Sequence, residues 1–158
     1  MQIEIDFLRY QDKLTFRKEG RQRYIHDPIR RKYLVQTPEE TVRQLTVLYL
    51  TEEKGYPKNR ISIEKKLKIN ELTKRFDILI YEEAMQPFLL VECKAPAVPI
   101  SQDTFRQIAI YNMPLNVRFL MVTNGLVTYC CEMNYELATY TFLEEVPAFP
   151  RKSSPEIS

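Results

Sequence analysis

The sequence predicts an α/β (α+β) domain with a mixed central sheet flanked by helices. Two observations carry this prediction. Apolar residues recur at helical spacing in two segments, and the segments between them alternate or run continuously apolar, as strands do. With 158 residues, 44% of them hydrophobic, the chain is long enough to bury a core of its own, which excludes disorder as a description of the whole chain.

The amino-terminal part contains one weak pattern and one clear helix start. Apolar and polar residues alternate loosely over residues 1–22, which indicates a short hairpin or an extended arm. Thr37-Pro38-Glu39-Glu40 is typical of a helix start, because Thr caps, Pro suits the first helical position, and Glu at the third can reach back to the cap amide. We expect a helix over about 38–53, ending before the turn at 55–57.

After that turn the spacing of apolar residues changes from the helical period of about 3.6 to a period of two, as in a strand. Alternation of Ile61, Ile63, Lys65 and Leu67 with polar residues predicts a first strand whose named residues share a face. Residues 76–81 predict a second strand, 82–87 a polar turn, and 88–94 a third strand. The three strands form a meander.

The remaining elements make the sheet mixed. Ser101 can cap a helix that runs to about Asn112, and the apolar run 118–123 predicts a buried strand. Asn124-Gly125 turns the chain into a further strand at 126–133. A strand, a crossover helix and another strand imply parallel pairing. We therefore expect the main domain over residues 23–143 and a loosely ordered tail over 144–158.

Composition excludes several function classes. Three glycines leave no Walker A loop, no dinucleotide fingerprint and so no ATP site. One histidine and three cysteines, two of them adjacent, do not form a spaced zinc motif. No apolar run approaches the roughly 18–20 residues that span a bilayer, and the amino terminus does not resemble a secretion signal. The sequence predicts a soluble cytoplasmic protein without a membrane partner.

The formal net charge of +2 conceals an asymmetry. Residues 1–76 contain 18 Lys+Arg against 11 Asp+Glu, whereas residues 77–158 contain 5 against 10. A basic half suits a polyanion such as nucleic acid, although a solvated face is the commoner explanation of scattered cations.

Charged residues emerge at the end of the third strand. Leu90, Glu92 and Lys94 share one face there, and buried strands seldom carry ions unless they are paired or functional. The ordinary explanation is a salt bridge between Glu92 and Lys94. However, a hairpin about the turn at 82–87 also places Asp77 opposite residues 92–94.

Two carboxylates and a lysine at one sheet edge indicate metal chemistry. Mg²⁺ prefers oxygen ligands, which Asp77, Glu92 and the main-chain carbonyl of Cys93 could supply. Mn²⁺ is the expected substitute. Lys94 would then assist water or stabilise charge on an attacked phosphate.

With these residues in this order of elements, the chain resembles the PD-(D/E)xK nuclease superfamily and its restriction-endonuclease-like αβββαβ core. It more closely resembles the amino-terminal nuclease domain of type I restriction enzyme R subunits. This second likeness depends on residues 27–33, 37–44, 74–78, 91–96 and 123–125. Phe76 replaces the proline of the superfamily motif, and the translocating ATPase of an R subunit is missing from this chain.

The resemblance implies further site residues. Gln107 and Tyr111, four apart on the second helix, resemble a Gln-x-x-x-Tyr motif that positions catalytic groups or DNA. An acidic residue of the first helix often completes the metal site; we favour Glu40 over Glu39, although capping already explains Glu40, and Glu64 is a possible supporting group.

The basic half would contact phosphates. We expect sequence-independent DNA contacts from residues around the first helix and strand: Arg30, Arg31, Lys32, Arg43, Lys65, Lys66 and Lys68. No base-reading module accompanies them.

Three functions are therefore compared. The leading hypothesis is a Mg²⁺-dependent DNA endonuclease domain that works with ATPase/translocase or specificity subunits. The second is a nuclease-fold protein that binds DNA or a partner subunit without cleaving by itself. The third is a structural protein in which Glu92 and Lys94 form only a salt bridge. The sequence predicts no oligomeric state.

Overall fold

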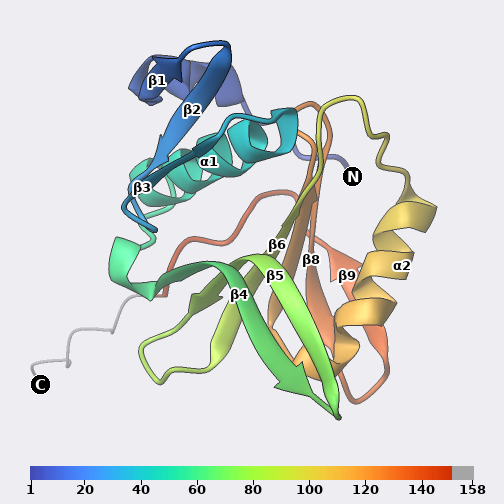
Figure 1. Ribbon diagram of the computed structural model, residues 1–158. Helices are drawn as coiled ribbons and strands as arrows, with labels where there is room; N and C mark the ends of the chain where they lie inside the picture. The colour runs from blue at the N-terminus through green and yellow to red at the C-terminus, as the bar shows by residue number, and fades with distance from the viewer. Residues whose placement is uncertain (151–158) are drawn as a thin grey trace, which may run out of the picture.

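The computed structural model of the protein describes residues 1–150, and contains a six-stranded sheet and a separate three-stranded sheet (Figure 1). The small sheet comprises β1 (Phe16–Glu19), β2 (Gln22–Asp27) and β3 (Lys32–Val35). The large sheet comprises β4 (Ile61–Ile69), β5 (Leu72–Tyr81), β6 (Pro87–Cys93), β7 (Phe119–Thr123), β8 (Thr128–Asn134) and β9 (Thr139–Phe142). The helices are α1 (Pro38–Glu52), α2 (Gln102–Asn112) and the short 3₁₀ segments η1 (Phe7–Lys13), η2 (Lys58–Arg60) and η3 (Met113–Leu115).

The large sheet confirms the predicted mixed architecture. Its strands lie in the order β4-β5-β6-β7-β8-β9, and β6 pairs in parallel with β7 while the other neighbours are antiparallel. The parallel pair is joined by α2, as a crossover connection requires. The succession α1, β4, β5, β6, α2, β7 gives the expected αβββαβ order.

Both predicted helix starts are confirmed, but the Glu40 carboxylate accepts from Arg30, Arg43 and Gln44 in place of the predicted bond to the cap amide. The Thr37 hydroxyl accepts a hydrogen bond from the Glu40 amide at 3.0 Å, and the Ser101 hydroxyl accepts one from the Thr104 amide at 3.1 Å. These caps satisfy amide groups that the first helical turn leaves without partners.

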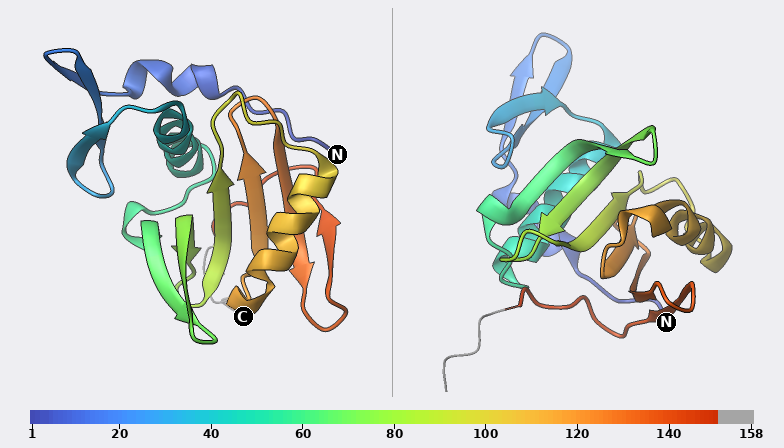
Figure 2. Two further views of the ribbon diagram at one scale, coloured as in Figure 1. Left: turned by 45° about the vertical axis from the view of Figure 1, so that its right-hand side comes forward. Right: turned by 90° about the horizontal axis from the view of Figure 1, so that it is seen from below.

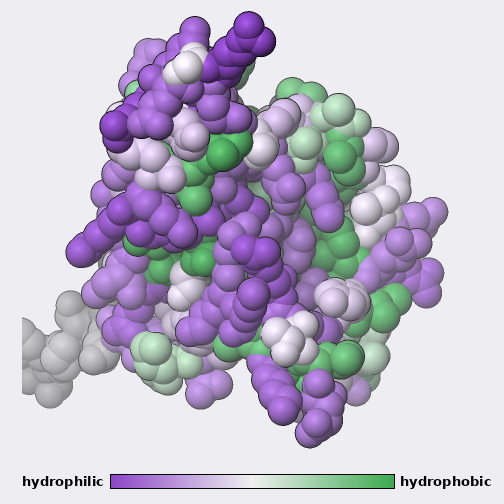
Figure 3. All heavy atoms as spheres, in the orientation of Figure 1, coloured by the Kyte–Doolittle hydropathy of each residue, from purple (hydrophilic) through white to green (hydrophobic). Residues whose placement is uncertain are grey.

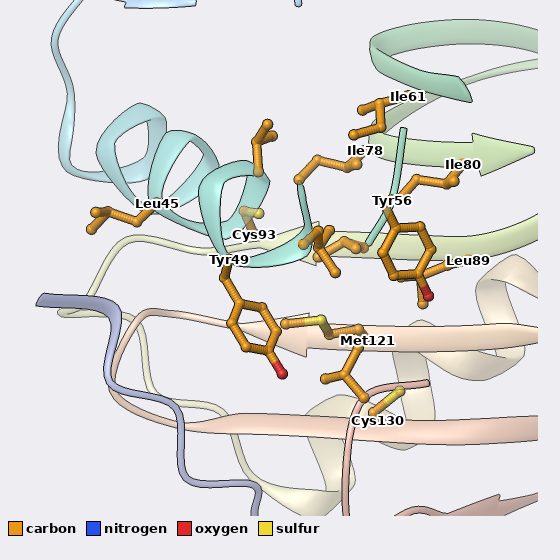
Figure 4. Packing of buried hydrophobic residues seen from close by; sticks show 14 of the residues in the cluster. Leu45, Tyr49, Tyr56, Ile61, Ile78, Ile80, Leu89, Cys93, Met121 and Cys130 are labelled. Atoms are coloured by element: carbon orange, nitrogen blue, oxygen red, sulfur yellow. The ribbon is translucent and has the colours of Figure 1, made fainter. Parts of the chain in front are cut away.

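The large sheet has an apolar core on each face. On the α1 face, Val47 and Leu50 of the helix pack over Ile78, Leu89 and other strand residues, among which Figure 4 shows Cys93 and Met121. On the α2 face, Phe105 and Ala109 pack against Leu79, Leu90 and Leu120. Figure 2 shows the two helices on opposite sides of the sheet.

The regular alternation expected for the first strand breaks at Glu64. Ile61 and Ile63 lie in the α1-side core, whereas Leu67 packs on the α2-side core, so these residues do not share a face. Glu64 has φ +52°, in the left-handed region that a non-glycine residue rarely adopts within a strand. On the paired strand, Phe76 and Ile78 likewise belong to opposite cores. Both strands therefore change face at the same position, and there Glu64 and Asp77 contact Arg43 of α1.

The chain ends depart from their expected descriptions. Residues 7–13 form η1, and Ile3, Phe7 and Tyr10 are buried in the α1-side core. Residues 144–150, expected to be loosely ordered, contain the fully buried Val146, while the Phe149 amide bonds to the Lys54 carbonyl. Residues 151–158 of the predicted tail lie outside the described residues.

Two further findings concern the helices and the cysteines. Within residues 1–150, no helix combines the length and the apolar character that crossing a membrane requires. The three cysteines are free and buried.

Candidate active site

Asp77 and Glu92 meet on neighbouring strands. The β5–β6 register pairs Ile78 with Val91, which places Asp77 beside Glu92, as the symmetry of the hairpin predicted. One Asp77 oxygen accepts a hydrogen bond from the Cys93 amide at 2.8 Å. Burial raises the pKa of the Glu92 carboxyl to about 8, aided by the negative charge of Asp77 and a hydrogen bond between the two carboxyl groups, while Lys94 opposes the shift. Glu92 therefore holds a proton more readily than an ordinary glutamate does.

Arg43 connects this pair to helix α1. Its guanidinium bonds to Asp77 at 3.0 Å and to Glu40 at 2.7 Å, and its side chain is only 5% exposed. Burial by itself lowers the pKa of Arg43, but the Glu40 charge and the Asp77 hydrogen bond raise it above its ordinary value, so this group keeps its positive charge. Gln44 also donates to Glu40, at 3.1 Å. Glu40 therefore holds Arg43 against Asp77.

A second arginine brings the β2–β3 turn to the same place. Arg30 contacts Glu40 at 2.8 Å and Glu64 at 3.1 Å, and it also pairs with the fully buried Asp27. Arg75 adds a 2.7 Å contact to Glu64. The network of ion pairs thus links the small sheet, α1, β4 and β5, with arginines alternating between carboxylates.

The carboxylate pair has donors that suit a hard cation. Asp77 and Glu92 offer carboxylate oxygens, and a divalent cation would offset both the burial and the Asp77 charge that raise the pKa of Glu92. Among residues 1–150, no three His, Cys, Asp or Glu side chains are grouped so as to hold a metal ion. The remaining ligands would therefore have to come from the Cys93 carbonyl and water. The Cys93 thiol is not a candidate ligand, because burial raises its pKa well above the usual range.

Lys94 lies just beyond β6, where the backbone is well fixed. Its amide donates to the Thr123 carbonyl at 2.9 Å. The Asn124 side chain donates to the Val98 carbonyl at 2.8 Å, which ties the loop after Lys94 to the turn after β7. In the part of the chain that the structure describes, no salt bridge joins Lys94 to Glu92, so the salt-bridge explanation does not describe this strand end.

The structure places the other predicted site residues as follows. Glu39 is exposed and lies 3.7 Å from Arg43, and its charge adds to the burial and the Asp77 charge that raise the pKa of Glu92. Glu64 contacts Arg30 and Arg75. Gln107 and Tyr111 lie on α2, on an exposed part of the helix. The Lys74 ammonium lies 4.1 Å from the centre of the Tyr111 ring and donates to the Tyr111 carbonyl.

The predicted phosphate contacts divide into two groups. Arg30 and Arg43 are engaged with carboxylates, and DNA contact would require those ion pairs to open. Arg31, Lys32, Lys66 and Lys68 are exposed, and the Lys65 ammonium lies 5.0 Å from the Tyr81 ring centre. Figure 3 shows hydrophilic side chains over much of the face that carries the small sheet and the β4–β5 hairpin.

Sequence reasoning missed the ion-pair network. Glu40 and Arg43 are three apart on a helix, a spacing that predicts contact, so this pair had a usable signal. Asp27, the last residue of β2, belongs to the resemblance at residues 27–33, but nothing in the sequence shows that its carboxylate is buried against Arg30. The contact of Arg30 with Glu64 joins residues 34 positions apart and depends on the fold.

The αβββαβ order, with Asp77 beside Glu92, is compatible with a nuclease-like α/β fold. The chain belongs to the family described as the type I restriction enzyme R protein N terminus, whose model matches residues 38–147. A search of curated proteins found no match. Among solved structures, the chain is similar to a fragment described as an HsdR subunit of a type I restriction enzyme from Vibrio vulnificus YJ016, with 21% identity and a TM-score of 0.47. The match covers 65% of this chain and 22% of that one.

Proposed function

We propose that this chain is a Mg²⁺-dependent DNA endonuclease domain of a restriction system. The observation that carries the proposal is the contact of Asp77 with the end of β6. Asp77 lies beside Glu92 and accepts a hydrogen bond from the Cys93 amide, and Lys94 follows directly. Membership of the R-subunit family supports it. Mn²⁺ is the expected substitute for Mg²⁺.

Each residue has a role in this proposal. Asp77, Glu92 and the Cys93 carbonyl would hold Mg²⁺, which when bound supplies a Lewis acid to the phosphate and lowers the pKa of water. Lys94 would hold a non-bridging phosphate oxygen or the attacking water. Arg43 fixes the position of Asp77, and Glu40 fixes Arg43. Glu40 would become a metal ligand itself only by exchanging its arginine partners.

Plasmid cleavage tests the proposal. The purified protein, with Mg²⁺ or Mn²⁺, should nick or linearise DNA, and Lys94→Ala should abolish cleavage while leaving thermal unfolding unchanged. Lys58→Ala, at an exposed lysine in η2, is the matched control and should cleave like the wild type. Equal cleavage by the Lys94 variant and the control would refute the role of Lys94.

A second function is favoured by Arg43. Because its guanidinium already neutralises Asp77, the domain could bind DNA or another subunit without cleaving by itself. Salt-sensitive DNA binding without metal-dependent nicking would support this alternative. ATPase/translocase and specificity subunits are the proposed partners, and adding them should then be necessary for cleavage.

A further inference from the structure

We infer that the small sheet β1-β2-β3 is a second DNA-binding surface, which holds the phosphate backbone of a duplex beside the candidate active site. This inference rests on the proposed function, because it assigns a surface to the same substrate. The small sheet lies outside the matched range 38–147, so the family match does not assign it a role.

Charge supplies the first argument. Over residues 16–35 the exposed cations are Arg17, Lys18, Arg21, Arg23, Arg31 and Lys32. The exposed acid in this range is Glu19, which pairs with Arg17 at 3.1 Å, while the second acid, Asp27, is buried against Arg30. An ordinary solvated face interleaves both signs, whereas this sheet presents nearly uniform positive charge. Such a surface fits phosphates spaced along a duplex.

Anchoring supplies the second argument. Asp27 accepts hydrogen bonds from the amides of Ile29 and Arg30, at 2.7 and 3.1 Å, which shapes the β2–β3 turn. Arg30 then fastens this turn to Glu40 and Glu64, beside Arg43 and Asp77. The exposed Arg31 follows directly, with φ +56°. The basic sheet is thus joined to the site by buried ion pairs, which makes it more than a loosely attached arm.

Placement supplies the third argument. In Figure 1 the small sheet lies at the top left and the tip of the β4–β5 hairpin at the bottom, and in the right-hand view of Figure 2 both lie toward the upper side of the molecule. The hairpin presents its own exposed cations, Lys66 and Lys68. A six-residue strand such as β2 extends roughly 20 Å, about the length of six base pairs. Phosphates could therefore be held on both sides of the acidic pair, which itself repels DNA.

Charge reversal tests the inference. Lys18→Glu/Arg21→Glu changes two exposed cations at the tip of the β1–β2 hairpin, and the control Arg106→Glu/Arg118→Glu changes two exposed cations elsewhere. Each variant lowers the formal net charge from +2 to −2. Fluorescence anisotropy with a short duplex, in EDTA to prevent cleavage, gives affinity across a salt series.

The hairpin variant should bind roughly tenfold or more weakly than the control, and the slope of log affinity against log salt should fall by about two for two lost contacts. The hairpin variant should unfold within about 0.5 kcal/mol of the wild type, as surface changes usually do, and the control should be somewhat less stable because Arg118 pairs with Glu132. If the reversals prevent folding, Lys18→Gln/Arg21→Gln and Arg106→Gln/Arg118→Gln replace them.

If the two variants have equal affinity for the duplex and equal salt dependence, the inference is overturned. The basic surface of the small sheet would then suit an acidic protein partner. A wild type that binds no duplex at any salt concentration would also overturn it. A wild type that binds DNA through the hairpin but does not cleave it would contradict only the cleavage proposal, so the two failures are distinguishable.

Discussion

The two faces of the large sheet are built in different ways. The α2 face is closed by an aromatic cluster, in which Phe105 meets Tyr129, Tyr140 and Phe142 at ring-centre distances of 5.1 to 6.1 Å. The α1 face also has an apolar core, but at its edge α1 carries the buried charges Glu40 and Arg43. Taking ions out of water costs free energy that their pairing must offset, so the α1 edge contributes less stability than an apolar contact would where the carboxylates gather. The α2 side also buries a charge, Lys74, but its ammonium is satisfied by the Tyr111 carbonyl and ring and not by carboxylates.

Removing Phe105 should produce the largest loss of stability. Phe105→Ala leaves a cavity in the aromatic cluster and should lower the free energy of unfolding by about 4 kcal/mol. Denaturant unfolding measures this, with exposed Leu126→Ala as the control. Metal binding by the folded fraction should not change, and a loss of it would show that the two faces do not have separate tasks.

Removing Arg43 should cost somewhat less. Arg43→Ala leaves Glu40 buried and Asp77 without its cation, and should lower the free energy of unfolding by about 3 kcal/mol, since Asp77 keeps some contact with water. The double variant Arg43→Ala/Asp77→Asn should recover part of the loss, because Glu40 keeps its contact with Arg30 whereas Asp77 is left without an arginine. Strictly additive effects of the two changes would contradict the coupling of these residues.

Glu92 should make stability depend on pH. Its pKa is about 8 in the folded protein and 4.5 as the ordinary value, so the folded state holds a proton that the unfolded state releases first. Metal-free protein should therefore be most stable below about pH 4.5 with respect to this group, and should lose that contribution as pH rises to about 8. Glu92→Gln should flatten this part of the profile of melting temperature against pH.

The control for Glu92 is Glu132→Gln, at an exposed glutamate paired with Arg118, which should follow the wild-type profile. Mg²⁺ should restore stability to the wild type at high pH more than to Glu92→Gln, because binding to the folded state stabilises it. Parallel profiles for wild type and Glu92→Gln would refute the raised pKa of Glu92.

Changes at the exposed surface of α2 should have the smallest effect on stability. Gln107→Ala and Tyr111→Phe should each shift the free energy of unfolding by less than about 0.5 kcal/mol, since Tyr111 is 62% exposed. If the Gln-x-x-x-Tyr resemblance is functional, cleavage should fall nevertheless. Unchanged cleavage would confine the chemistry to the α1 edge and sharpen the contrast between the faces.

Local sequence signals predicted most of the elements. Thr37 and Ser101 marked two helix starts correctly, since capping depends on a few adjacent residues. The turn at 82–87 was sufficient to place Asp77 beside Glu92, because hairpin register follows from the turn. The strand β9 and the small sheet's third strand, β3, were not predicted, as short strands carry little periodic signal.

The sequence by itself determined the αβββαβ order and the meeting of two carboxylates near Lys94, because periodicity, capping and turns are local. Only the tertiary structure decided what surrounds that pair. The left-handed backbone at Glu64 breaks an alternation that reads as regular in the sequence, and it accompanies the contact of this glutamate with Arg30, 34 residues away. The partners of Arg30 and Arg43 likewise come from separate elements. A charged side chain reaches whatever opposite charge the fold brings within a few ångströms, and burial then makes that pairing obligatory.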